Sequence, residues 1–263
     1  MDQNYELDNS YLLVKLKETV YGVPCPNVQS IVQLSRIFTS PDLAMPVRGY
    51  IDIRGKMIIT IDLRLFLGIK SVEEETLNVV ELIQKRKADH INWLNNLTTS
   101  VHENIEFKLA TDPHKCAFGV WYDSYKPIDH VMKEYLQRFD APHKAIHSIA
   151  EKVKEFTRNN CHEAALQLIE NTRNSELNKM IRLFDSFEEM YRSSIKELVV
   201  ILKKDEQAIG IIVDEVLSIE KVIEQSGLTM DNALFSNNTF KVGKCSKDET
   251  MVIICDTEKL FNI

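Results

Sequence analysis

Residues 73–103 read EEETLNVVELIQKRKADHINWLNNLTTSVHE, a stretch that contains neither glycine nor proline. Its apolar side chains recur every three or four residues, which predicts one long amphipathic helix. The predicted inward face consists of Val80, Ile83, Lys87, His90, Leu94, Leu97 and Val101. A histidine on such a face needs partners for both ring nitrogens, so His90 is the informative residue of this helix.

Glycine placement puts this helix inside a longer helical segment. Of the 8 glycines in the chain, only Gly119 lies between residues 69 and 209. Few turn residues with many Leu, Glu, Lys, Asn and Ile favour helix. We expect three more helices: one at about 128–139, one from Asp140-Ala141-Pro142 with Asp140 as its cap, and one after Asn159-Asn160. An even number of antiparallel helices would return the chain near its point of departure.

Short β-branched runs on both sides of this segment predict strands. They are residues 11–16, 49–54, 57–61, 198–202, 209–213 and 251–255. Arg54-Gly55-Lys56 has the composition of a hairpin turn. We therefore expect an α+β chain in which an all-β domain, residues 1–71 and 195–263, is interrupted by a four-helix insert at 72–194.

Composition restricts the class of partner. At 263 residues the chain fits two domains, and its net charge of −7, with no Lys/Arg run, argues against nucleic acid. Met1–Glu6 lacks the positive start of a signal peptide, and no apolar run approaches the roughly 20 residues of a membrane span. We expect a cytoplasmic protein that binds a protein or a small ligand. The 5 cysteines, an odd number, favour thiols or metal ligands over disulfides.

A metal site is predicted by four residues of the helical segment. His143 and His147 are four residues apart and therefore share a helix face, as two imidazoles that grip one metal do. Cys116, on an irregular stretch where Gly119 allows a tight turn, offers sulfur beneath Phe118 and Trp121. With His90, these residues form a set that suits Zn²⁺, although copper would also bind it tightly. Four protein ligands leave no open position for an activated water, which disfavours an enzyme.

Other interpretations of these residues stay open. His90 could be an ordinary core histidine bonded to backbone or water, and His114 is the alternative ligand beside Cys116. The zinc could be purely structural and stabilise a docking or dimerisation surface. A zinc hydrolase is a third hypothesis, which needs water in place of one of the four ligands.

Three motifs of the insert resemble the chemoreceptor zinc-binding (CZB) domain. They are His90-Ile-Asn-Trp93, Asp112-Pro-His-Lys-Cys116-Ala-Phe-Gly-Val-Trp121 and His143-Lys-Ala-Ile-His147. The resemblance implies that His90, Cys116, His143 and His147 bind zinc in a four-helix bundle that often dimerises. The family usually has a basic residue where this chain has Val120.

The flanking segments resemble the CheW family, whose fold of two small β-barrels couples chemoreceptors to the histidine kinase CheA. The matching stretches are Tyr21-Gly-Val-Pro24, Val47-Arg-Gly-Tyr-Ile-Asp-Ile-Arg-Gly55, Ile61-Asp-Leu-Arg64, Val213-Asp-Glu-Val216 and Val252-Ile-Ile-Cys-Asp256. Arg54 keeps the position that the family uses for receptor and kinase contact, whereas Asp52 replaces its usual asparagine. Alternatively, Arg54 only braces the hairpin.

The two resemblances together imply a non-enzymatic chemosensory adaptor. It would couple the cytoplasmic domains of chemoreceptors to CheA, and its insert would sense zinc or the oxidation of the Cys116 thiolate. A homodimer through the insert is a further expectation.

Overall fold

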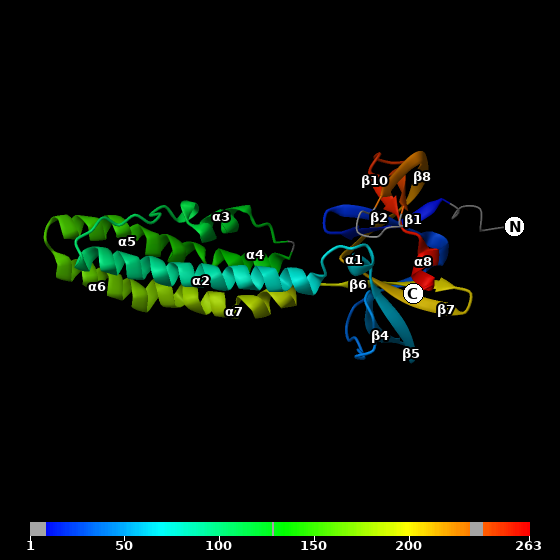
Figure 1. Ribbon diagram of the computed structural model, residues 1–263, viewed down its shortest axis with the longest axis horizontal. Helices are drawn as coiled ribbons and strands as arrows, with labels where there is room; N and C mark the ends of the chain where they lie inside the picture. The colour runs from blue at the N-terminus through cyan, green and yellow to red at the C-terminus, as the bar shows by residue number, and fades with distance from the viewer. Residues whose placement is uncertain (1–8, 128, 232–238) are drawn as a thin grey trace. The chain divides into compact units, whose positions relative to one another are not determined.

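The computed structural model describes residues 9–127, 129–231 and 239–263, so the predictions that concern Met1–Glu6 and Ile128 lie outside the described residues. The chain divides into two compact units, one made of Met1–Ser71 with Lys196–Ile263 and the other of Val72–Ile195 (Figure 1). Among the described residues, the first unit holds all the strands and the second is helical, which confirms the α+β class.

Hydrogen bonds close one sheet of the β unit into a barrel in the order β1-β2-β10-β9-β8. Its strands are β1 (Ser10–Leu16), β2 (Thr19–Pro24), β8 (Glu215–Asp231), β9 (Thr239–Cys245) and β10 (Met251–Ile254). A five-stranded sheet follows the order β3-β6-β7-β5-β4. Its strands are β3 (Val28–Gln33), β4 (Val47–Ile53), β5 (Lys56–Asp62), β6 (Leu198–Lys204) and β7 (Gln207–Val213). Both sheets combine strands from before and after the helical segment, so these two stretches fold together.

The two sheets share one apolar core. Val14 and Leu16 of the barrel pack in the same cluster as Ile61, Val200 and Ile211 of the five-stranded sheet. Such contacts explain why the apolar residues of the six predicted strands alternate in some strands and form continuous runs in others. Short helices α1 (Leu63–Phe66) and α8 (Thr257–Phe261), with the 3₁₀ turn Cys25–Asn27, complete the unit.

The hairpin between β4 and β5 turns on Arg54 and Gly55. Both have positive φ, 55° and 81°, as a two-residue turn of type I′ requires. The Asp52 carboxylate accepts a hydrogen bond from the Gly55 amide at 2.7 Å, so Asp52 braces this turn. Arg54 itself is exposed at the tip.

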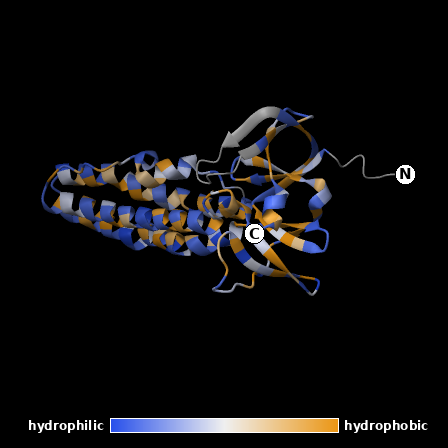
Figure 2. Cartoon of the chain, turned by 45° about the vertical axis from the view of Figure 1, so that its right-hand side comes forward, coloured by the Kyte–Doolittle hydropathy of each residue, from blue (hydrophilic) through white to orange (hydrophobic). Residues whose placement is uncertain are grey.

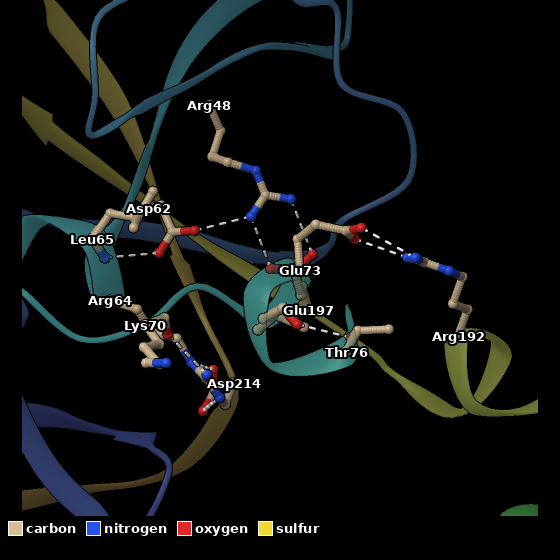
Figure 3. Close-up of polar contacts among 11 residues, drawn as sticks. Arg48, Asp62, Arg64, Leu65, Lys70, Glu73, Thr76, Arg192, Glu197 and Asp214 are labelled. Carbon is tan, nitrogen blue, oxygen red and sulfur yellow. Dashed lines mark hydrogen bonds and ion pairs between the residues drawn. The ribbon is translucent and has the colours of Figure 1, made fainter. Parts of the chain in front are cut away.

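Two partly buried ion-pair groups stabilise the β unit (Figure 3). Arg48 donates to Asp62 at 2.9 Å and to Glu197 at 3.2 Å, and only 2% of the Asp62 side chain is exposed. Arg64 binds both carboxylate oxygens of Asp214, at 2.7 and 2.6 Å. The Arg48–Glu197 and Arg64–Asp214 pairings join residues from opposite sides of the helical segment in the sequence.

The helical unit begins with α2 (Val72–His102) and ends with α6 (His162–Thr172), a π-helical turn (Arg173–Leu177) and α7 (Asn178–Ser194) in unbroken succession. Between them lie α3 (Ala117–Ser124), α4 (His130–Gln137) and α5 (Asp140–Arg158), with a 3₁₀ turn at Pro113–Lys115. Cys116 lies on an irregular stretch, as predicted, but a helix that the sequence does not predict, α3, begins directly after it. Asp140 lies within the first turn of α5 instead of capping it.

These helices bury one continuous apolar core, which includes Ile83, Leu94, Phe118, Ile146 and Phe184. In Figure 2, hydrophobic and hydrophilic segments alternate along the helices, as expected when each helix buries one face. Glu73, in the first turn of α2, accepts two hydrogen bonds from Arg192, in the last turn of α7, at 2.8 and 3.1 Å. This pair joins the start of the unit to its end (Figure 3).

Candidate metal centre

Four donor side chains converge inside the helical unit. One nitrogen or sulfur atom from each of His90, Cys116, His143 and His147 lies within 4.8 Å of the others. The three histidines are buried, with 3%, 6% and 2% of their surface exposed, and Cys116 is half-buried. The structure thus brings together all four residues that the sequence singles out.

His90 is oriented by its own helix. Its Nδ1 lies 2.8 Å from the carbonyl oxygen of Arg86, one turn earlier in α2. A carbonyl only accepts, so Nδ1 carries the proton and donates, which leaves the lone pair of Nε2 facing the cluster. Burial lowers the pKa of His90, so the ring is neutral near pH 7.

His143 and His147 occupy successive turns of α5, as their spacing predicts. Nδ1 of His147 lies 3.1 Å from the Ala110 carbonyl, to which it donates. Its Nε2 is buried and has no hydrogen-bond partner among the described residues. Burial, reinforced by repulsion from neighbouring imidazoles, lowers the pKa of His143 to about 3 and that of His147 to about 4. Both rings are therefore neutral and can bind a metal at neutral pH.

Cys116 is the N-cap of α3, and its sulfur accepts a hydrogen bond from the Gly119 amide at 3.2 Å. The same Sγ lies 3.2 Å from Nε2 of His143 and 4.0 Å from Nε2 of His90. Burial raises the pKa of this thiol in the metal-free chain. A bound cation would reverse that tendency, since a coordinating thiol is deprotonated.

Gly119 serves close packing and not the tight turn that the sequence predicts. It lies within α3, and a Cβ at this position would stand 1.9 Å from the carbonyl oxygen of Pro113. Only glycine allows the 3₁₀ turn before Cys116 to approach α3 this closely. Gly119 therefore fixes the position of the sulfur.

Aromatic rings enclose the donors. The ring centroid of Phe118 lies 5.0 Å from His143 and 5.7 Å from His90, and Trp93 lies 4.8 Å from His147. The Trp93 indole also donates to the Ala110 carbonyl, at 2.8 Å. Phe118 covers the site as predicted, whereas Trp121 packs one layer further out, against Phe118. The sequence gives no signal for the Ala110 carbonyl, because any residue supplies one.

The donor set fits Zn²⁺. One sulfur and three imidazole nitrogens are ligands that zinc prefers, typically at about 2.3 Å and 2.0–2.1 Å. The buried Nε2 of His147 without a partner is the atom that a cation would satisfy. The hydrogen bonds from Nδ1 of His90 and His147 to carbonyl oxygens are the outer contacts that orient metal-binding histidines.

The other candidate residues lie apart from this cluster. His114 is exposed, and its Nδ1 lies 2.8 Å from the Asp123 carboxylate, so the structure does not place it among the donors. Arg54 belongs to the β unit, where its side chain is exposed. Arg86 places a largely buried guanidinium beside His90, paired with Asp89 at 3.1 Å, while its Nε lacks a hydrogen-bond partner in the described part of the chain.

These features define an α+β protein with a cluster of His and Cys donors whose chemistry suits a metal ion, and family models make the assignment specific. Residues 10–89 match the CheW-like domain, and residues 90–154 match the chemoreceptor zinc-binding domain. The chain thus carries a CheW-like domain followed by a CZB domain, which confirms both resemblances. Both are non-catalytic kinds of domain, and together they indicate a chemotaxis signalling adaptor with a zinc-binding domain. The boundary between the two matches falls inside helix α2.

Among solved structures, the scaffolding protein TtCheW from Thermoanaerobacter tengcongensis is similar over 97% of this chain and 88% of that chain, at 13% sequence identity and a TM-score of 0.40. No curated protein matches the chain significantly. Within the described ranges, no helix combines the length and apolar character that crossing a bilayer requires.

Proposed function

We propose that this protein is a cytoplasmic adaptor that links chemoreceptors to the histidine kinase CheA and adjusts that link through zinc bound in its helical unit. The observation that carries the proposal is the convergence of His90, Cys116, His143 and His147 in a segment inserted between strands of a CheW-like domain. We further propose that the β unit is a pair of small β-barrels and that the helical unit inserted into it is an antiparallel four-helix bundle. In that bundle, α3 with α4 counts as one interrupted helix, and α6 through α7 counts as another.

The four donors would serve as the complete ligand set of a Zn²⁺ ion. When bound, the metal holds Cys116 as a thiolate and cross-links α2, α5 and the start of α3. Because all four positions are taken by protein, the role is structural or regulatory rather than hydrolytic.

The sulfur makes the site responsive to oxidants as well as to zinc. Hydrogen peroxide would transfer one oxygen atom to the Cys116 thiolate, giving a sulfenic acid and releasing hydroxide, a two-electron oxidation of sulfur. Sulfenic acid is a poorer ligand than thiolate, so metal affinity would fall. The buried imidazoles would then lose their partner, which favours a different packing of the helices.

Arg54 is the residue we assign to the contact with receptor or kinase. It is exposed at the tip of a rigid two-residue hairpin turn, and the bracing of that turn comes from Asp52. A guanidinium displayed in this way is available to a carboxylate on a partner. We also propose that the helical unit can form a homodimer.

Reconstituted kinase assays with receptor, CheA and this protein test the proposal. We expect zinc chelation and Cys116→Ala to change kinase output in the same direction, and Arg54→Ala to weaken coupling without affecting zinc. Output that is unchanged by both chelation and Cys116→Ala would contradict regulation by the metal.

A second function is purely structural: the zinc only stabilises the helical unit as a docking or dimerisation surface. The burial of all three imidazoles favours this function. It predicts that mild oxidant has no graded effect on kinase output until the helical unit melts. A graded response below that point supports the sensing function instead.

A further inference from the structure

The helical unit has a pocket that is separate from the donor cluster. It has a volume of about 340 Å³ and lies between the end of α2, the segment 104–111 and the second half of α5. Apolar side chains that include Leu97, Phe107 and Val153 line it, and none of the four donors does. This volume is within the range of small-molecule sites, roughly 300–1,000 Å³.

Charges of both signs line the same pocket. Glu106 and Glu151 contribute carboxylates, and Lys154 and Arg158 contribute cations from one face of α5. All four side chains are exposed, and no ion pair or hydrogen bond joins any of them to another side chain in the described ranges. Opposite charges that share a pocket without pairing leave both signs available to a ligand.

Trp93 and Ala110 lie between this pocket and the donor cluster and contact residues of both. The Trp93 ring centroid lies 5.0 Å from Phe107 in the pocket and 4.8 Å from His147 in the cluster. The Ala110 carbonyl accepts hydrogen bonds from Trp93 and His147 and immediately precedes Thr111, which lines the pocket. Movement of segment 104–111 would therefore disturb the contact that orients His147.

We propose that this pocket binds a small zwitterion with an apolar side chain, the chemistry of a free apolar α-amino acid. Its ammonium group would lie toward Glu106 and Glu151, its carboxylate toward Lys154 and Arg158, and its side chain against Phe107 and Leu97. Occupancy of the pocket alters the metal affinity of the cluster, a second step that rests on the proposed zinc function. Coupling between two sites is reciprocal, so zinc alters the affinity of the amino acid by the same factor.

Calorimetric titration of the full-length wild-type chain with L-phenylalanine tests the pocket. We expect saturable binding that is at least tenfold weaker for 3-phenylpropanoate and for phenethylamine, each of which keeps only one charge. Lys154→Gln should weaken binding at least tenfold, whereas Lys152→Gln, on the same helix but outside the pocket, should not. No saturable binding, equal binding of the one-charge analogues, or equal effects of the two substitutions would each overturn the assignment.

The coupling is tested by repeating the titration on zinc-loaded and chelated protein, with Trp93 fluorescence as a second readout in a Trp121→Phe background. A shift in affinity of at least threefold between the two forms supports the coupling, and identical affinities overturn it. Zinc binding without amino acid, measured in the same series, reports on the proposed function separately. Its absence would contradict that function but not the pocket.

Discussion

The Sγ atom of Cys116 lies 3.2 Å from Nε2 of His143, although the two residues belong to different helices. Cys116 caps the start of α3, and His143 lies in the first turns of α5. The two donors meet only when these helices are packed. Metal binding at this cluster would therefore be coupled to the folding of the helical unit, as it is where no preformed site exists in the unfolded chain.

Replacing the sulfur should remove most of the zinc affinity. We expect Cys116→Ser to weaken zinc binding by roughly 100-fold or more, since loss of an outer contact alone costs about 10–100-fold. Cys161→Ser is the matched control, because Cys161 is exposed and lies outside the cluster. Competition with a chromophoric chelator measures both. Equal affinities for the two variants would contradict the role of Cys116.

The metal-free protein should lose stability as pH falls below 6.5. The folded-state pKa is about 3 for His143 and about 4 for His147, whereas the ordinary value is 6.5. Between 6.5 and about 4 the unfolded chain binds more protons, so the free energy of unfolding decreases by up to about 1.4 kcal/mol per histidine for each pH unit. Urea denaturation of chelated protein at pH 7.5, 6 and 5 measures this slope.

Substitutions separate this effect from other titrations. His143→Gln should remove part of the slope, whereas Ser148→Ala, at an exposed position of the same helix that carries no titratable group, should leave it unchanged. A free energy of unfolding that stays constant from pH 6.5 to 5 would show that the buried imidazoles do not control stability.

A methyl group at Gly119 should destabilise the helical unit. The new Cβ would collide with the Pro113 carbonyl, so either α3 or the turn before it must move. We expect Gly119→Ala to cost about 1–3 kcal/mol or more of unfolding free energy and to weaken zinc binding. Val120→Ala, on an exposed position of the same helix, should cost less than about 0.5 kcal/mol. A Gly119→Ala protein as stable as Val120→Ala would refute the close packing.

Removing the Arg48 guanidinium should destabilise the β unit and leave the zinc affinity of the helical unit unchanged. Arg48→Met leaves the buried Asp62 without its cation, at an expected cost of about 2–4 kcal/mol. Lys15→Met, which removes a more exposed pair with Glu18, should cost less than about 1 kcal/mol. Chemical denaturation and zinc titration of both variants test this. A loss of zinc affinity in the folded Arg48→Met protein would contradict the assignment of all four metal ligands to the helical unit.

Sequence periodicity was sufficient for the long helices and the three histidine donors. The stripe that contains His90 and the spacing of His143 and His147 both follow from 3.6 residues per turn, which a single sequence displays directly. Lys87 in that stripe proved to be partly buried, where it pairs with Asp185 of α7.

Several other elements show no such periodic pattern in the sequence. Helix α3 has only 8 residues, too few for periodicity, so its stretch resembles a loop in the sequence. Strand β3 is largely exposed and lacks an apolar alternation, and β2 contains Gly22 and Pro24, which weaken a strand prediction. The π-helical turn at Arg173–Leu177 and the shared Ala110 carbonyl depend on tertiary packing.

Metal analysis of the purified protein tests the central claim most directly. Native mass spectrometry of the wild-type chain, prepared with zinc present and then dialysed, should find one zinc ion per chain, and His147→Ala and Cys116→Ala should each retain far less. Wild-type protein that carries no metal after metal-replete preparation, or that keeps its zinc when both residues are replaced, would contradict the account.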